Sequence, residues 1–338
     1  MKKKNYTLAE VAKAANVSPM TASRAINNRS GVSSQTKAHV LKLAAEMGYV
    51  VNRAAQKLSG GRSHIIGIVA TEISNQFNSA LIASAGDAAW AAGYEILVYS
   101  HVVREKKPSG SVIQLLRQIA DGVIAVLPLK YGYLDDIASI HIPVITVEHT
   151  GQTSSFPSIS SDSYEGARMA MRHLIELGHR RVAFITGDER LSSAEDRHRA
   201  YLDCVAQYGL ARDRSLVVPG DFSMNRGYQA MRKLLSLKKR PTAVFAANDL
   251  TAFGAINAIR ETDLRVPDDI SVIGFDDLPA AAQFYPPLTT IRQPIQQIGR
   301  SAVNSLLAMM AGIDPASHQV VLPTELVVRA TTAPPRIP

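Results

Sequence analysis

Apolar residues follow two different patterns along the chain. In the first 50 residues they recur at helical spacing, as Leu8, Val11 and Ala12 do. From Ile65 onward, short continuous apolar runs alternate with longer amphipathic stretches such as 164–178. Continuous apolar runs are typical of strands that are covered on both faces. The pattern therefore predicts a helical head followed by an α/β body.

The head contains start and stop signals for three short helices. Residues 7–10, TLAE, form a capping box, in which the threonine hydroxyl accepts from a backbone N–H and the glutamate reaches back. Ser18 and Pro19 restart a helix after a turn at 16–17, because serine favours the N-cap and proline favours the first helical position. A third helix is expected over about 33–48. Two short helices joined by a tight turn, with a third behind them, predict a helix-turn-helix domain.

The body contains eight apolar runs with the character of buried strands. They are IIGIVAT (65–71), YEILVYS (94–100), GVIAVLP (122–128), PVITVEH (143–149), RVAFITGD (181–188), SLVVPG (215–220), AVFAAND (243–249) and ISVIGFDD (270–277). Helical stretches lie between them, so parallel sheets with helices on both faces are expected. Eight strands fit one large sheet, a barrel or two doubly wound sheets, and periodicity alone does not choose among these.

Polar residues stand at the ends of several predicted strands. They are Thr71, Glu148, Asp188, Asn248, Asp249, Asp276 and Asp277. Ligands of open α/β sheets bind at the carboxyl ends of the strands, which makes these residues candidates for a binding site. The alternative is that they are ordinary helix caps and loop residues.

The positive charge of the chain is concentrated in its head. Residues 1–62 contain eleven Lys or Arg and two Asp or Glu, whereas residues 63–338 contain 26 and 27. A nearly neutral body with a basic head favours a polyanionic partner, and nucleic acid is the most common one. A basic segment that is merely solvated is the alternative.

Several classes of protein are disfavoured by what the chain lacks. No apolar run reaches about 18 residues, which argues against a membrane span. The start MKKKNYTLAE has no apolar stretch after its lysines, so the expected location is the cytoplasm. The single cysteine, Cys204, cannot form an internal disulfide and is expected to be buried. No CxxC, HExxH or GxxxxGK[ST] motif is present, so neither a metal nor a cofactor is expected.

The sequence also lacks the motifs expected of an enzyme. A GxSxG motif is absent, the histidines are scattered, and the glycine-rich GGRSHIIG precedes a strand, whereas a dinucleotide-binding loop follows one. Two alternatives to a DNA-binding regulator stay open at this point. One is a cytoplasmic α/β enzyme, and the other is a sugar-binding protein, each with an accessory basic head.

Longer stretches carry a resemblance to a known family. They are TLAEVAKAANVSPMTASRAINN (7–28), GVSSQTKAHVLKLAAEMGYVVNRAAQKLSGGRS (31–63), GHRRVAFITG (178–187), VFAANDLTAFGAINAIRE (244–261), LRVPDDISVIGFDD (264–277) and PPLTTIRQP (286–294). Together they make the chain, over about residues 6–332, resemble the LacI/GalR family of bacterial transcription regulators.

The resemblance implies a domain organisation. A helix-turn-helix DNA-binding domain (1–50) would lead through a hinge helix (51–62) into an effector-binding and dimerisation body (63–338). That body would consist of two Rossmann-like subdomains, as in periplasmic sugar-binding proteins. The N-subdomain would take 63–161 and 291–322, and the C-subdomain 162–290 and 323–338. The chain ends at Pro338 without the tetramerising tail known in the family, so a homodimer on palindromic operator DNA is expected.

The resemblance also implies DNA contacts. Pro19 and Met20 match the main specificity positions and offer only apolar contact, for example to thymine methyl groups, so no operator sequence follows. Arg24 matches a base-contacting arginine that suits guanine. The expected phosphate-side contacts are Thr7, Ser18, Ser23, Asn27, Ser33 and Thr36. The hinge contacts are Asn52, Arg53, Ala55 and Leu58, of which Leu58 would be the minor-groove wedge.

Finally, the resemblance implies an effector site between the subdomains. The matching residues of the C-subdomain are Arg197, Phe222, Asn248 and Asp276, with Arg190 as a weaker candidate. Those of the N-subdomain are Asn75, Phe77 and Glu148. Charged and amide groups beside aromatic rings suit a small polyhydroxylated, sugar-like ligand. The expected function is a repressor that such an effector releases or engages.

Overall fold

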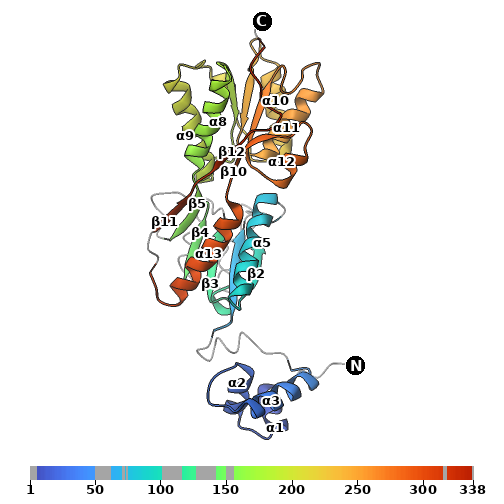
Figure 1. The fold of residues 1–338 in the computed structure, drawn as a ribbon, viewed down its shortest axis with the longest axis vertical. Helices are drawn as coiled ribbons and strands as arrows, with labels where there is room; N and C mark the ends of the chain where they lie inside the picture. The colour runs from blue at the N-terminus through green and yellow to red at the C-terminus, as the bar shows by residue number, and fades with distance from the viewer. Residues whose placement is uncertain are drawn as a thin grey trace, which may run out of the picture. The chain divides into compact units, whose positions relative to one another are not determined.

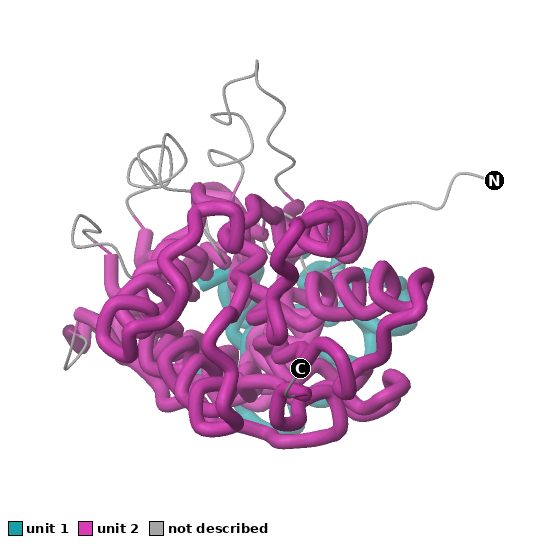
Figure 2. The backbone as a smooth tube through the Cα atoms, turned by 90° about the horizontal axis from the view of Figure 1, so that it is seen from above, with its two compact units in different colours: residues 1–63 teal, residues 64–338 magenta. Residues whose placement is uncertain are grey.

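The computed structural model describes residues 6–49, 62–70, 73, 75–100, 116–126, 142–149, 156–314 and 318–336. The chain divides into two compact units, residues 1–63 and 64–338, which Figure 2 shows in teal and magenta. Each unit contains its own buried apolar core. The predicted hinge contacts Asn52, Arg53, Ala55 and Leu58 lie outside the described residues.

The first unit consists of three helices, as the capping signals predict. They are α1 (Leu8–Ala14), α2 (Pro19–Ile26) and α3 (Ser34–Glu46). Asn16 adopts a left-handed φ of 53° in the turn between α1 and α2. Val11, Ala22 and Val40, one from each helix, are fully buried and pack together. Their burial forms the apolar core of this unit.

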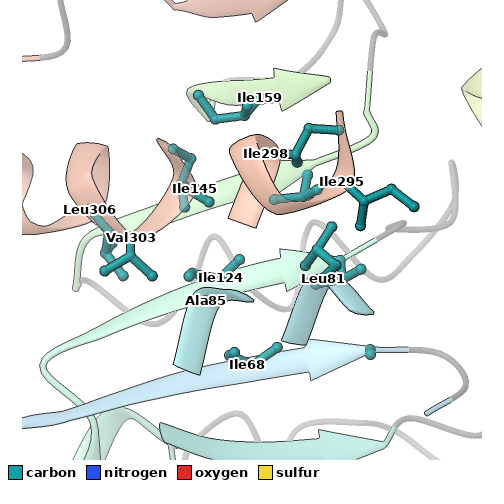
Figure 3. Packing of buried hydrophobic residues seen from close by; sticks show 14 of the residues in the cluster. Ile68, Leu81, Ala85, Ile124, Ile145, Ile159, Ile295, Ile298, Val303 and Leu306 are labelled. Carbon is teal, nitrogen blue, oxygen red and sulfur yellow. The ribbon is translucent and has the colours of Figure 1, made fainter. Parts of the chain in front are cut away.

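The second unit begins with a six-stranded parallel sheet. Its strands are β1 (Ile65–Ala70), β2 (Glu95–Ser100), β3 (Gly122–Val126), β4 (Val144–Val147), β5 (Ser158–Ser161) and β11 (Gln319–Leu322), in the order β11-β5-β4-β3-β1-β2. The helices α5 (Gln76–Ala91) and α13 (Ile295–Met310) pack on it. Figure 3 shows this core, in which Leu81 and Ile298 lie against Ile124 and Ile145. We call this sheet with its helices the N-subdomain.

A second six-stranded sheet forms the other half. Its strands are β6 (Val182–Ile185), β7 (Val217–Val218), β8 (Ala243–Ala246), β9 (Ser271–Asp276), β10 (Thr289–Arg292) and β12 (Glu325–Val327), in the order β12-β10-β9-β8-β6-β7. Its helices are α8 (Ser163–Glu176), α9 (Ser192–Gln207), η1 (Arg214–Leu216), α10 (Met224–Leu235), α11 (Asp249–Arg260) and α12 (Pro279–Gln283). Helices α8 and α9 cover one face and α10 and α11 the other, as Figure 1 shows. This is the C-subdomain.

Two doubly wound sheets are therefore the correct choice among the three arrangements that the pattern allows. The chain crosses between the sheets after β5, between β10 and α13, and between β11 and β12. Strand β10 continues through Arg292, because Arg292 pairs with Asp276 on β9 and with Glu325 on β12, and the chain leaves the second sheet after this residue. Among the described residues, no helix is both long and apolar enough to span a bilayer.

Candidate functional site

The exposed face of α2 carries five of the predicted DNA contacts. Pro19, Met20 and Arg24 are exposed, and Ser23 and Asn27 are half-buried at the spacing of successive helical turns. The exposed fraction of Met20, 65%, is high for an apolar side chain. The opposite face is formed by buried alanines of the head's core. This exposed face of α2 is apolar and cationic and does not pack on the head's core. In a helix-turn-helix domain such a face is the surface expected to enter a DNA groove.

Arg24 is available for an external partner. Its side chain has no hydrogen bond or ion pair to any residue in the described part of the chain. The guanidinium lies beside Gly31, where an added Cβ atom would stand 3.3 Å from Nη1. Gly31 also has a φ of +90°, which a side chain would strain. The glycine therefore both allows this turn and leaves room for the arginine.

Three predicted phosphate contacts are helix caps in the structure. The hydroxyls of Thr7, Ser18 and Ser33 accept from the backbone N–H of Glu10 (3.3 Å), Thr21 (3.1 Å) and Thr36 (3.1 Å). Each cap satisfies a donor that the first helical turn leaves unpaired. Any phosphate contact that these exposed side chains make is therefore additional to a structural role.

In the body, buried polar side chains from both subdomains form one continuous network. We call Glu148, Ser161, Arg197, Asp276 and Gln293 the junction cluster. All five are at most 5% exposed. Glu148 follows β4, and its carboxylate accepts from the backbone N–H of Ser161 at 2.7 Å and from the Ser161 hydroxyl at 3.3 Å. The ends of β4 and β5 are thereby tied together on the N-subdomain side.

Gln293 joins this pair to the C-subdomain. It stands in the crossing segment between β10 and α13, so it belongs to the connection between the sheets. Its side-chain oxygen accepts from the Ser161 hydroxyl at 2.5 Å, and its Nε2 donates to Asp276 Oδ1 at 2.6 Å. Its backbone N–H also donates to the Asp276 carbonyl at 3.2 Å. One amide side chain therefore connects the two walls of the junction.

Arg197 of α9 completes the cluster. Its Nη1 donates to the Ala247 carbonyl at 2.7 Å and lies 3.9 Å from Asp276 Oδ1, and its Nη2 donates to the Ser163 hydroxyl at 3.3 Å. The guanidinium carbon is 3.6 Å from the centre of the Phe275 ring, a cation–π contact. The buried Nε has no hydrogen-bond partner among the described residues. A buried donor without a partner is costly, so it marks a place where a ligand acceptor would be stabilising.

Phe222 and Asn248 lie next to Arg197. The Phe222 ring centre is 5.7 Å from the Arg197 guanidinium, and Asn248 Nδ2 donates to the Phe222 carbonyl at 3.1 Å. Asn248 also caps α11 by accepting from the Thr251 N–H at 2.9 Å. Gly187 makes this packing possible, because a Cβ atom there would stand 2.1 Å from the Phe222 ring.

Strained backbone occurs at the same places. Glu148, Phe222 and Asp276 have φ values of 59°, 68° and 127°, in the region that favours glycine. Non-glycine residues held at positive φ often occur at functional sites, because the surrounding structure must enforce them.

Burial changes the protonation of the junction. It raises the pKa of Glu148 to about 7 and that of Asp276 to about 6, although the Arg197 charge works against both shifts. Burial also raises the pKa of the neighbouring Asp249, which accepts from the Leu278 N–H at 2.8 Å. Glu148 and Asp276 therefore gain or lose protons near neutral pH and can either donate to or accept from hydroxyl groups of a ligand.

The other predicted effector residues do not join the junction cluster. Asn75 caps α5 by accepting from the Phe77 N–H at 2.8 Å, and the Phe77 ring is buried in the N-subdomain core. Arg190 is exposed and pairs with Asp188 of its own loop at 2.7 Å. The structure thus gives these three side chains local partners, whereas it brings Arg197, Phe222, Asn248 and Asp276 together and links them to Glu148.

Sequence reasoning missed two members of the cluster. Ser161 lies in the short strand SISS, and Gln293 lies in the stretch IRQP that connects the sheets. The only signal is their position where the chain crosses between the subdomains. Among the described residues, no group of His, Cys, Asp and Glu side chains has the arrangement of a metal site.

Comparisons with known proteins agree with this architecture. Residues 7–52 match the family of bacterial regulatory proteins, lacI family, and residues 171–332 match the periplasmic binding protein-like domain. The transcriptional regulator DegA of Bacillus subtilis is 35% identical over 332 residues, covering 97% of this chain and 98% of that protein.

Solved structures give the same result. A lac repressor dimer bound to operator and the anti-inducer ONPF is similar with a TM-score of 0.86 and 32% identity, over 98% of this chain and 100% of that chain. The transcriptional regulator CelR in complex with cellobiose has a TM-score of 0.73 and 29% identity, over 97% and 100%. The predicted helix-turn-helix domain with a two-subdomain periplasmic-binding-protein-like body is thus confirmed. The chain belongs to the lacI family of bacterial regulatory proteins, and it is a DNA-binding transcription regulator rather than an enzyme.

Proposed function

We propose that this protein is a homodimeric repressor that binds a two-fold operator and is regulated by a small polyhydroxylated effector at the junction cluster. The observation that carries the proposal is Arg197, a buried cation with one unused donor, beside an aromatic ring and two carboxyl groups with raised pKa values. Sugar hydroxyls both donate and accept, and a sugar ring has an apolar face that suits Phe222.

The DNA half of the proposal rests on α2. Met20 and Pro19 would contact thymine methyl groups, and Arg24 would donate to guanine O6 and N7. Thr7, Ser18, Ser23, Asn27, Ser33 and Thr36 would position the domain on phosphates, and the hinge residues Asn52, Arg53, Ala55 and Leu58 would enter the minor groove. One head covers few base pairs, so a symmetric dimer on a palindrome is needed for specific binding.

The regulatory half rests on the Gln293 link. A ligand that hydrogen-bonds to Asp276 or Ser161 competes with Gln293, the only described side chain that joins these two residues. Displacing Gln293 would change the preferred orientation of the two subdomains. An effector can alter DNA affinity only by its differential affinity for the two orientations, and such coupling is typically about 1–3 kcal/mol. Glu148, Arg197, Phe222, Asn248 and Asp276 are the proposed first contacts, and Asn75, Phe77 and Arg190 are secondary ones.

The comparisons support a sugar-like effector without identifying it. CelR is described in complex with cellobiose and the lac repressor with ONPF, and both have the same two-subdomain body. A screen of monosaccharides, disaccharides and sugar phosphates by thermal shift, followed by operator titration, would find the effector and its sign. A body that no polyhydroxylated compound stabilises would refute this half of the proposal.

The DNA half is tested separately. Selection from random duplexes should return a palindrome, and binding should weaken steeply with salt. Leu58→Ala should reduce DNA bending while leaving non-specific binding nearly unchanged. Equal affinity for a half-site and for the palindrome, together with a monomeric mass in solution, would refute the dimer. We place the protein on the nucleoid DNA of a bacterial cytoplasm, which a fluorescent fusion would test.

A further inference from the structure

A groove on the outer side of the C-subdomain lies apart from the junction cluster. It has a volume of about 540 Å³ and is formed by the second half of α9, the loop that follows this helix, and β7. Its lining includes Tyr201, Leu202, Val205, Ala206 and Val217. A volume of this size is in the range of small-molecule sites, which is about 300–1,000 Å³.

The floor and walls of the groove are apolar and partly open to solvent. Tyr201 and Val205 are buried, whereas Leu202 is 49% exposed and Ala206 is exposed. The Tyr201 hydroxyl donates to the Val182 carbonyl at 3.0 Å, so the polar end of the ring is already satisfied. Exposed leucine beside a hollow is unfavourable in water, and an apolar ligand would cover it.

The rim of the groove is positively charged. Arg212 and Arg214 are exposed and have no side-chain hydrogen bond or ion pair within the described part of the chain. Asp213 stands between them, but its carboxylate is held by Ser215 at 2.6 Å and by Arg181 at 2.6 Å, and these bonds lower the pKa of Asp213 to about 2. The charge of Asp213 is thus balanced by Arg181, and the two rim arginines are left without an internal counter-ion.

We propose that this groove is a second small-molecule site, for an amphipathic anion with a flat apolar body and one carboxylate or phosphate group. The apolar body would lie over Val205 and Val217, and the anionic group would meet Arg212 and Arg214, whose guanidinium groups suit planar, two-point binding of oxyanions. The groove begins one residue after Arg197 along α9, so one helix serves both sites.

The test uses 2-naphthyl phosphate and 2-naphthoate as probes for the two anionic groups. Titration calorimetry of the full chain should give saturable one-site binding to at least one of them, with Kd about 1 mM or tighter. Inorganic phosphate and 2-naphthol, each carrying half of the required chemistry, should bind at least about tenfold more weakly. If neither probe saturates the protein at 10-fold above that Kd, which is about 10 mM, the proposal is wrong.

Variants assign the site. Arg212→Gln with Arg214→Gln should weaken binding at least about tenfold, and Ala206→Trp, which fills the groove from an exposed position, should abolish it. The matched control, Arg226→Gln with Lys233→Gln, removes the same charge from exposed positions of α10, on the other face of the sheet, and should change Kd by less than about twofold. Phe222→Ala should leave binding unchanged. Loss of binding in Phe222→Ala, or its survival in the arginine pair or in Ala206→Trp, would place the probe elsewhere and overturn the proposal.

Discussion

The head and the junction cluster place their functional side chains in opposite environments. On α2 the candidate base contacts Pro19, Met20 and Arg24 are exposed, and Arg24 has no side-chain partner in the described residues. At the junction the candidates are almost fully buried, and nearly every polar atom already has a partner. Exposed donors can meet a large polyanion without prior rearrangement, whereas a buried network must exchange internal partners for those of a ligand.

This difference fits the two tasks. A DNA-binding surface gains affinity from contacts that add to one another along the duplex, so its residues can act separately. A regulatory site must instead favour one of two arrangements of the body. A single chain of hydrogen bonds that crosses from Glu148 through Ser161 and Gln293 to Asp276 is suited to that, because breaking one bond changes the connection between the walls.

The strongest test of the buried side of the comparison is Arg197→Ala. Removing one partner of a buried ion pair leaves Asp276 uncompensated, which typically costs about 3–5 kcal/mol. We therefore expect a large loss in the free energy of unfolding, measured by urea titration of the body, and a complete loss of effector response. The operator affinity of the folded variant should differ from that of the wild type by only a few-fold.

Arg199 of the same helix provides the control. It is exposed and pairs with Asp196 at 2.9 Å, so Arg199→Ala should cost less than about 1 kcal/mol. If Arg197→Ala were as mild as Arg199→Ala and still responded to the effector, the junction cluster would not be the regulatory site.

The second test concerns the pH dependence of the junction. Burial raises the pKa of Glu148 from 4.5 to about 7, so the folded state holds this proton at a pH where the unfolded chain has released it. The folded state is therefore favoured below pH 4.5 and loses stability as the pH rises towards 7. The corresponding penalty above pH 7 is about 3 kcal/mol.

Glu148→Gln should remove this penalty, since a neutral amide can keep the bonds to Ser161. The unfolding temperature of the variant should exceed that of the wild type at pH 8 and match it near pH 4.5. Glu165→Gln on the exposed face of α8 serves as the control and should show no such pH-dependent difference. An equal difference at both pH values would mean that Glu148 does not carry the proton.

The same contrast explains what sequence analysis could predict. The three head helices follow from local signals, such as the serine-proline start of α2 and the capping box of Thr7 and Glu10, and the structure has these caps. Eight of the twelve strands described in the body also follow from their apolar runs, whereas β5, β10, β11 and β12 are not among the eight predicted runs. Their division into two sheets does not, because which strands pair depends on crossings between segments far apart in the chain.

The junction cluster shows more clearly which functional residues the sequence cannot predict. Arg197 and Asp276 could be chosen from the family resemblance, but Gln293 gains its role from lying between residues 132 and 17 positions away in the sequence. No local pattern distinguishes it from an ordinary loop glutamine. Conversely, the family resemblance makes Phe77 an expected effector contact, whereas the structure buries its ring in the N-subdomain core.

On the exposed side, the larger expected effect belongs to Arg24. Arg24→Ala should reduce specific operator affinity by about 1–3 kcal/mol and relax the preference at one base pair in each half-site. The stability of the head should hardly change, because the side chain has no internal partner to lose.

The control is Arg29→Ala, at an exposed position just beyond α2, which should weaken operator binding without altering the sequence preference. Quantitative selection on a randomised operator would separate the two, and an unchanged preference for Arg24→Ala would remove it from base contact.

The smallest expected effect concerns Thr7, which can act both as a helix cap and as a DNA contact. Thr7 caps α1, so Thr7→Ala should lower the stability of the head by about 1 kcal/mol, measured by hydrogen exchange of the α1 amides. Thr7→Asp separates the two roles that this residue can have. An aspartate caps a helix as well as threonine does, but its carboxylate would lie close to the Glu10 carboxylate that the Thr7 hydroxyl contacts at 3.1 Å, so the stability of Thr7→Asp should lie between that of the wild type and that of Thr7→Ala. If Thr7 also lies on a phosphate, the added negative charge should weaken operator binding markedly more in Thr7→Asp than in Thr7→Ala. Equal affinities of the two variants would instead assign Thr7 to capping alone.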